Sequence, residues 1–108
     1  SKITGDLPDN YEAKIGDILF KLLPAGSISG APKKKTIEII QAAELGKRGS
    51  YTGVFGYFDG KNLDSGVMIR LIENVDGQLF YKSGGGITTF SQMEKEYQEM
   101  IDKVYLPL

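Results

Sequence analysis

Two carboxylates and a lysine share one side of a helix expected near the end of the chain. Glu96 and Glu99 are three residues apart, which places both on one helix face. Lys103 follows Glu99 by one turn, so these two could form an ion pair. Such polar faces are commonly only solvated. Alternatively, the two carboxylates could bind Mg²⁺, which accepts one or two carboxylates and completes its shell with water and substrate oxygens.

Arg70 is the second residue whose surroundings suggest chemistry. The sequence predicts a strand over residues 64–72. Alternation within it places Arg70 on a mostly apolar face with Met68 and Ile72. An internal ion pair, or a side chain that extends to the sheet edge, would spare the guanidinium the cost of unpaired burial. A bound carboxylate or phosphate would do the same, because the guanidinium matches either in bidentate geometry.

Two stretches rich in small residues are candidates for anion binding. Gly84, Gly85 and Gly86 follow the last expected strand, and consecutive glycines let backbone N–H groups approach a ligand closely. The same glycines could be only a flexible connection. The stretch PAGSISGAPKKK, residues 24–35, carries two hydroxyls and leads into an expected helix start, whose N–H groups are available to an anion. This stretch lacks the spacing of a P-loop.

Three consecutive lysines open the helix that follows this loop. Lys33, Lys34 and Lys35 stand where the partial positive charge of a helix N-terminus favours acidic residues. Either solvent screens this conflict, or an anion lies close to the lysines. We expect Lys33 to reach the loop, and Lys34 and Lys35 to face solvent.

The composition limits the kinds of site that the chain can build. Its 108 residues include neither cysteine nor histidine, which excludes disulfides, thiolate metal sites and the usual general base. Any metal would be a hard cation held by carboxylates, with magnesium the first expectation. The net charge of -1 gives no global attraction to nucleic acid or anionic lipid. Without a bilayer-spanning apolar run or a visible signal peptide, a soluble cytoplasmic protein is expected.

The first half of the chain reads as mainly helical. A short edge strand is expected over residues 1–5 and a helix over 11–23, where apolar residues recur at helical spacing. Residues 26–30 are expected to be a loop. A second helix should begin at Pro32, whose missing N–H has no partner there, and should end at Gly46.

The second half reads as three strands and a helix. Alternating residues predict strands over 51–58, 64–72 and 78–83, joined by Asp-Gly turns into an antiparallel meander. The last helix should begin near Ser91, with Ser91 and Glu94 forming a capping box. The expected order is β-α-α-β-β-β-α, an α+β fold with helices packed on an antiparallel sheet. With 41% hydrophobic residues, the chain should bury a core.

Four stretches resemble, in order, the C-terminal motifs of the chorismate-utilising enzymes: PAGSISGAPK, RGSYTGVFGYF, DSGVMIR and SGGGITTFSQMEKEYQEMIDK. The resemblance extends from about Ile3 to Val104, and within the family it is closest to the aminodeoxychorismate synthase branch. It implies the layered anthranilate-synthase-like fold, with residues 1–108 as the C-terminal part of the catalytic domain. The family's nucleophile or base would then lie upstream, so we expect no catalytic residue in this chain and no activity from it alone.

The resemblance also implies roles for individual residues. The implied substrate-binding positions are Ser29, Tyr51, Arg70, Gly84, Gly85 and Gly86, and the implied magnesium ligands are Glu96 and Glu99. In the family, the positions of Tyr51 and Arg70 bind the enolpyruvyl carboxylate. The glycine backbone receives a substrate carboxylate, and the position of Ser29 lies near the ring.

The reaction implied by the resemblance joins chorismate and ammonia with the help of magnesium. The product would be 4-amino-4-deoxychorismate, a precursor of 4-aminobenzoate and folate, and a glutamine amidotransferase subunit would supply the ammonia. The first alternative is the large component of anthranilate synthase, which acts in tryptophan biosynthesis. Isochorismate or salicylate formation is a third option. A non-enzyme alternative is an anion-binding α+β module whose lysines contact phosphate or a partner surface.

Overall fold

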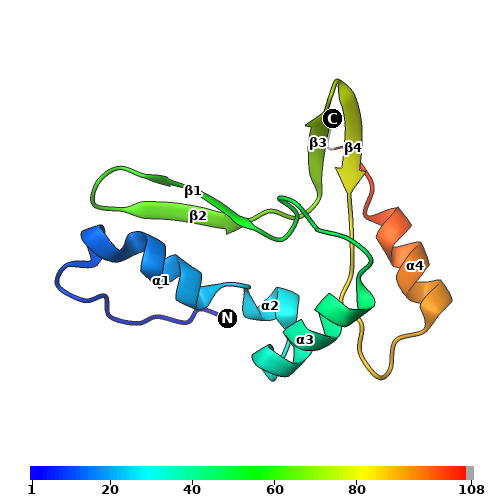
Figure 1. Ribbon diagram of the computed structural model, residues 1–108, viewed down its shortest axis with the longest axis horizontal. Helices are drawn as coiled ribbons and strands as arrows, with labels where there is room; N and C mark the ends of the chain where they lie inside the picture. The colour runs from blue at the N-terminus through cyan, green and yellow to red at the C-terminus, as the bar shows by residue number, and fades with distance from the viewer. Residues whose placement is uncertain (107–108) are drawn as a thin grey trace.

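The computed structural model describes residues 1–106, which form helices and two β-hairpins in an elongated arrangement of 49 × 37 × 28 Å (Figure 1). Residues 1–8 contain no helix or strand, so the edge strand expected over 1–5 is wrong. Its apolar residue Ile3 is 96% exposed. Within the described residues each sheet has only two strands, and neither includes this segment.

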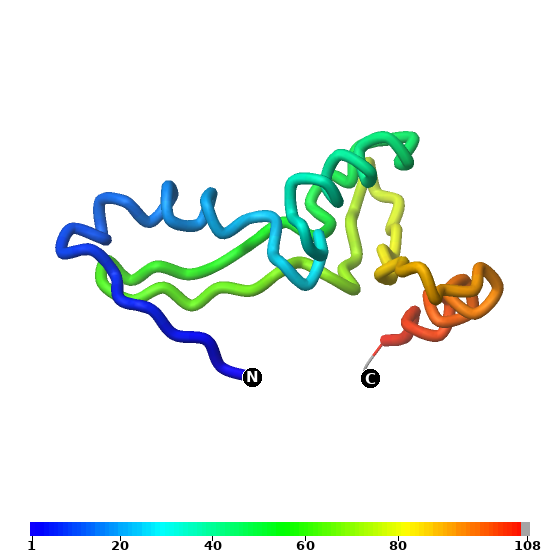
Figure 2. Tube along the Cα trace, turned by 90° about the horizontal axis from the view of Figure 1, so that it is seen from below, coloured from blue at the N-terminus to red at the C-terminus, as the bar shows by residue number. Residues whose placement is uncertain are grey.

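The first helical segment follows the sequence pattern. A 3₁₀ turn, η1 (Tyr11–Lys14), leads directly into α1 (Ile15–Leu22), so the helix expected over 11–23 is confirmed. The Tyr11 hydroxyl donates a hydrogen bond of 2.9 Å to the carbonyl of Lys61. This bond ties the start of the helix to the turn of the first hairpin, and Figures 1 and 2 both show α1 running beside that hairpin.

Residues 26–30 form one helical turn, so the loop expected there is wrong. In α2 (Gly26–Ser29), the N–H groups of residues 28–30 donate to the carbonyls of Ala25 and Gly26. Ser29 is the one buried residue among residues 1–106, with its hydroxyl 3.4 Å from the Ala25 carbonyl oxygen.

The next helix, α3 (Lys33–Ala43), begins one residue later than the expected start at Pro32, which has an extended backbone and precedes the first turn. It ends before Gly46, because Glu44 already has an extended backbone with ψ of 133°. The helix thus ends at Ala43, three residues before the expected end at Gly46. The earlier end frees the Glu44 side chain for a contact in the loop that follows.

The lysines that open α3 do not need an anion to explain them. The Lys33 ammonium donates to the carbonyl of Leu22, the last residue of α1, at 3.2 Å. Positive charge is favourable at a helix C-terminus, so Lys33 stabilises α1 rather than opposing α3. Lys34 and Lys35 are exposed, as expected, and Lys35 lies 3.6 Å from Glu38.

The strands form two separate antiparallel hairpins. They are β1 (Val54–Phe58) with β2 (Leu63–Val67), and β3 (Leu71–Val75) with β4 (Gln78–Lys82). The three-stranded meander is therefore wrong. The strand expected over 64–72 breaks at residues 68–70, where Arg70 has a φ of 51°. That left-handed conformation cannot continue a strand, so the alternation of faces assumed around Arg70 is also wrong.

The last helix, α4 (Met93–Asp102), begins two residues later than expected. The residue before it, Gln92, makes no side-chain cap hydrogen bond. The Ser91 hydroxyl instead accepts the N–H of Thr88 at 2.9 Å, so the capping box with Glu94 is wrong. In the part of the chain that the structure describes, no helix is long and apolar enough to cross a membrane.

The α+β class is confirmed, but the described residues bury no apolar side chain. Large apolar side chains such as Phe20 (83%) and Leu79 (67%) are mostly exposed. Figure 2 shows why: α1 with the first hairpin lies at one end of the molecule, and α4 lies at the other. The core expected from the composition is therefore absent from residues 1–106.

Candidate functional site

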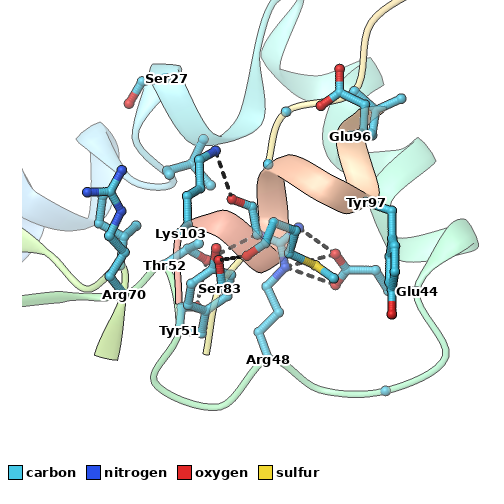
Figure 3. Close-up of a pocket in the computed structure, with 18 of the residues that line it drawn as sticks. Ser27, Glu44, Arg48, Tyr51, Thr52, Arg70, Ser83, Glu96, Tyr97 and Lys103 are labelled. Carbon is cyan, nitrogen blue, oxygen red and sulfur yellow. Dashed lines mark hydrogen bonds and ion pairs between the residues drawn. The ribbon is translucent and has the colours of Figure 1, made fainter. Parts of the chain in front are cut away.

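A cavity of about 920 Å³ lies among the loop after α3, the glycine segment after β4 and α4 (Figure 3). Most of the expected site residues line it, namely Tyr51, Arg70, Gly84, Gly85, Gly86 and Glu96. Ser29 and Glu99 are not among its lining residues. The cavity therefore gathers groups that the sequence spreads over more than forty positions, from 51 to 96.

The glycine segment approaches Tyr51 as closely as its lack of side chains allows. A Cβ added to Gly84 would lie 2.5 Å from the Tyr51 hydroxyl, so any larger residue at this position would require Tyr51 or the backbone to shift. A Cβ added to Gly85 would lie 3.7 Å from Glu96 Oε2 and 3.9 Å from Lys103 Nζ. The exposed backbone of Gly85 thus lies close to both a carboxylate and an ammonium group.

Lys103 is a cavity residue that the sequence indicated only as a partner of Glu99. Its ammonium donates to the Gly84 carbonyl at 3.4 Å and forms an ion pair with Glu99, which confirms the expected pair. The Lys103 side chain is only 25% exposed. Its spacing of seven residues from Glu96 was the available signal, because two full turns return to the same helix face.

The carboxylates partly fit a magnesium ion. Glu96 is half-buried and lines the cavity, whereas Glu99 is 58% exposed and bound to Lys103. Within residues 1–106, no cluster of three or more candidate ligands exists. Magnesium accepts one or two carboxylates with substrate and water oxygens, so Glu96 alone could begin such a site. Glu99 could join it only by releasing Lys103.

Arg70 is exposed rather than enclosed by apolar neighbours. Its guanidinium lies 5.9 Å from the ring centroid of Tyr105, a cation–π contact. None of the ion pairs found among the described residues includes Arg70. The internal ion pair that the sequence suggested for Arg70 is therefore not present among the described residues. In the view of Figure 3, Lys103 lies between Arg70 and Glu96.

Sequence reasoning missed the ion pair between Arg48 and Glu44, both of which line the cavity. Arg48 donates from Nε and Nη2 to the Glu44 carboxylate, and from Nη1 to Thr52 Oγ1 at 3.1 Å. These hydrogen bonds hold the pKa of the Glu44 carboxyl below its usual value and raise the pKa of Arg48. The spacing of four residues was a signal, but Glu44 lies just outside its helix.

Ser29 lies in a second cavity, of about 560 Å³, on the other side of the Arg48–Glu44 pair. It is buried, and its hydroxyl contacts backbone carbonyls of its own turn. Ser27, from the same turn, is exposed and lines the larger cavity instead. The structure therefore does not bring Ser29 together with Arg70 and the glycine segment.

Comparison with known proteins gives matches over the whole chain. A family described as chorismate binding enzyme matches residues 1–108. An uncharacterized PabA-like protein of Pasteurella multocida is 62% identical over 100% of this chain and 33% of its own length. Aminodeoxychorismate synthase component 1 of Escherichia coli is 44% identical over 96% of this chain and 23% of its own length.

A relative from a second branch is equally similar over a shorter stretch. Anthranilate synthase component 1 of Acetivibrio thermocellus is 47% identical over 81% of this chain and 18% of its own length. The chain thus spans a third or less of the length of these relatives. No solved structure matches it.

Proposed function

The chain belongs to the chorismate-binding enzymes, and from this we propose that it is part of an aminodeoxychorismate synthase component 1. The complete enzyme would convert chorismate and ammonia to 4-amino-4-deoxychorismate. Residues 1–108 would form the C-terminal part of its catalytic domain. The enzyme would act in the cytoplasm, in the synthesis of 4-aminobenzoate and folate.

The observation that carries this proposal is the composition of the larger cavity. Arg70 and Lys103 bring positive charge to its wall, and the glycine segment brings an exposed backbone. Chorismate carries two carboxylates, which such groups can bind by charge-assisted hydrogen bonds. The family consists of enzymes, which favours this hypothesis over an anion-binding module without activity.

Magnesium is the cofactor that we propose for this cavity. Glu96 would coordinate the ion, and Glu99 would coordinate it as well once its ion pair with Lys103 is broken. When bound, magnesium would orient the ring carboxylate and stabilise charge that develops on the substrate. The residues of this chain would bind the substrate: Arg70 and Tyr51 at the enolpyruvyl carboxylate, and the glycine backbone at a carboxylate oxygen.

The addition of ammonia requires groups outside this chain. A general base or nucleophile is not found among histidines or cysteines, since the chain has neither. We propose that further residues of a full-length protein, as long as the relatives, supply this base or nucleophile. We also propose that a glutamine amidotransferase subunit delivers ammonia. Similarity to the E. coli synthase over 96% of the chain supports this branch.

The test is the product formed by the full-length protein. Chorismate, ammonia and Mg²⁺ are supplied, a downstream lyase is added, and the products are separated by chromatography. The proposal predicts 4-aminobenzoate. Anthranilate as the only product would instead support the alternative, anthranilate synthase, which the similarity to the A. thermocellus enzyme favours. The absence of any chorismate turnover would contradict both.

A further inference from the structure

The Lys82 side chain connects the second hairpin to the loop that carries Tyr51; we call its contacts with Glu73 and with the Arg48 carbonyl the bridge. The ammonium of Lys82, the last residue of β4, lies 2.7 Å from Glu73 Oε2 on β3. It also donates to the backbone carbonyl of Arg48 at 3.0 Å. Both side chains are mostly shielded from solvent, with Lys82 31% and Glu73 21% exposed. Hydrogen bonds to charged groups in such surroundings are among the stronger ones.

The bridge lies where two chain segments enter the cavity. Gly84 follows Lys82 by two residues, and Tyr51 follows Arg48 by three. These two segments approach each other at the Tyr51 hydroxyl and Gly84, where a Cβ added to Gly84 would lie 2.5 Å from the hydroxyl oxygen. A shift of the loop relative to the end of β4 would therefore change this contact directly.

The other hydrogen bonds that the structure describes for the two segments do not connect them to each other. The Ser83 hydroxyl donates to the Met100 carbonyl at 2.9 Å, which ties the glycine segment to α4 and not to the loop. The Arg48 guanidinium binds Glu44 and Thr52, which stiffens the loop internally. The bond from Lys82 to the Arg48 carbonyl is the hydrogen bond found between the two segments in residues 1–106.

We propose that Lys82 is a positioning residue: its bridge from Glu73 to the Arg48 carbonyl holds the Tyr51 hydroxyl against Gly84 and so sets the shape of the carboxylate-binding backbone. Lys82 itself does not line the cavity, so it acts through Tyr51 and not on the substrate. The part of this inference that concerns substrate rests on the proposed function. The part that concerns the loop does not.

The first test measures amide hydrogen exchange in the full-length protein. Lys82→Met keeps the length of the side chain and removes its charge and donors. We expect exchange of residues 48–53 and 83–86 to accelerate about tenfold, the effect of losing one charged hydrogen bond. Lys82→Arg, which keeps the donors, should remain near the wild-type rate. Lys95→Met, at an exposed position of α4, is the matched control and should change neither segment.

The second test is a double-mutant cycle with Tyr51→Phe, read as kcat/KM for chorismate. Lys82→Met should lower kcat/KM about tenfold when Tyr51 is present, and less than about twofold in the Tyr51→Phe background. Equal losses in both backgrounds would overturn the proposal, because they would indicate a general structural role. Unchanged exchange in Lys82→Met would overturn it as well. If the wild-type protein does not turn over chorismate, the proposed function fails, and the exchange experiment alone decides the role of Lys82.

Discussion

The two glutamates of α4 stand in different electrostatic environments. Glu96 is half-buried at the cavity, close to Gly85, while Glu99 is mostly exposed and neutralised by Lys103. A cation that enters with the substrate would meet the carboxylate of Glu96 without competition. It would have to displace an ammonium to reach Glu99. The two residues should therefore differ in how strongly they affect magnesium dependence.

Substitution of the two glutamates in the full-length protein should reveal this difference. We expect Glu96→Gln to lower kcat by about 100-fold or more and to raise the magnesium concentration needed for half-maximal rate. Glu99→Gln should have a smaller effect, about tenfold. Magnesium titrations of initial rates measure both. Glu94→Gln, at an exposed position in the first turn of the helix, is the control. Magnesium dependence identical to wild type in Glu96→Gln would contradict the proposed site.

Gly84 offers a sharper steric prediction. In Gly84→Ala the new Cβ would lie 2.5 Å from the Tyr51 hydroxyl, so the Tyr51 side chain, its loop or the glycine segment must shift. We expect KM for chorismate to rise about tenfold, as overpacking typically costs about 1–3 kcal/mol. In a Tyr51→Phe background, Gly84→Ala should raise KM by a smaller factor than in wild type, because the nearest atom is already absent. In the matched variant Gly86→Ala, the new Cβ would have no neighbour within 4 Å, and a loss as large as in Gly84→Ala would contradict the steric explanation.

At the scale of helices and strands, the sequence predicted the elements that are determined by local residue pattern. Apolar periodicity predicted η1 with α1, and turn residues predicted both hairpin turns. The break at 68–70 could not be predicted, because Met68 and Ile69 continue a strand pattern and the left-handed conformation falls on Arg70 rather than on a glycine. The α2 turn was missed because small residues suit a loop equally well.

The candidate site was predictable by residue type, but not by proximity. Glu96, Arg70 and the glycine segment stood out because a carboxylate, a guanidinium and a bare backbone suggest chemistry by themselves. Lys82 carries no such signal, since its importance depends on a carbonyl more than thirty residues away in sequence, at Arg48. The spacing of Lys103 from Glu96 indicated a shared helix face, but its contact with the Gly84 carbonyl becomes visible only when α4 is placed beside the glycine segment.

The loop between α3 and β1 should respond to pH through Glu44. The hydrogen bonds from Arg48 lower the pKa of Glu44 below its ordinary value of 4.5. The ion pair therefore contributes its full stabilisation of the folded protein at pH values above 4.5. This stabilisation is lost as the pH falls through the lower pKa of the folded state. Glu44→Gln should therefore reduce the stability of the full-length protein near neutral pH by about 0.3–1 kcal/mol, a value set by solvent screening. The difference from wild type should disappear in more acidic solution.

Denaturant unfolding at a series of pH values measures this effect. The exposed variant Glu38→Gln, whose ion pair with Lys35 is largely solvated, should show a smaller difference at every pH. A stability difference between Glu44→Gln and wild type that grows as the solution is acidified would contradict the role assigned to the pair.

At the scale of the whole molecule, the main feature is the missing core. The described residues bury no apolar side chain, although the chain is 41% hydrophobic. Burial of apolar surface is the main favourable term in folding, so residues 1–106 have little to offset the loss of chain entropy. Relatives three or more times as long have further residues that could cover these surfaces.

The isolated 108-residue chain should therefore be poorly folded and inactive. We expect it to bind the dye ANS, to unfold without a cooperative thermal transition, and to leave chorismate unchanged in the presence of ammonia and Mg²⁺. Calorimetry, dye fluorescence and product analysis test these points, with the full-length protein as the control. A cooperative transition or measurable turnover by the isolated chain would contradict this expectation.

The independence of the two hairpins has an evolutionary consequence. The β1–β2 pair shares no ladder hydrogen bond with β3–β4 in the described chain, and only β4 leads into the glycine segment. The base of the first hairpin still borders the cavity, because the N–H of Thr52 donates to the Met68 carbonyl at 2.7 Å and Thr52 lines the cavity together with Tyr51 and Arg70. Sequence divergence should therefore be tolerated best at the far end of the first hairpin, around its turn at residues 59–62, and least where its strands meet the cavity.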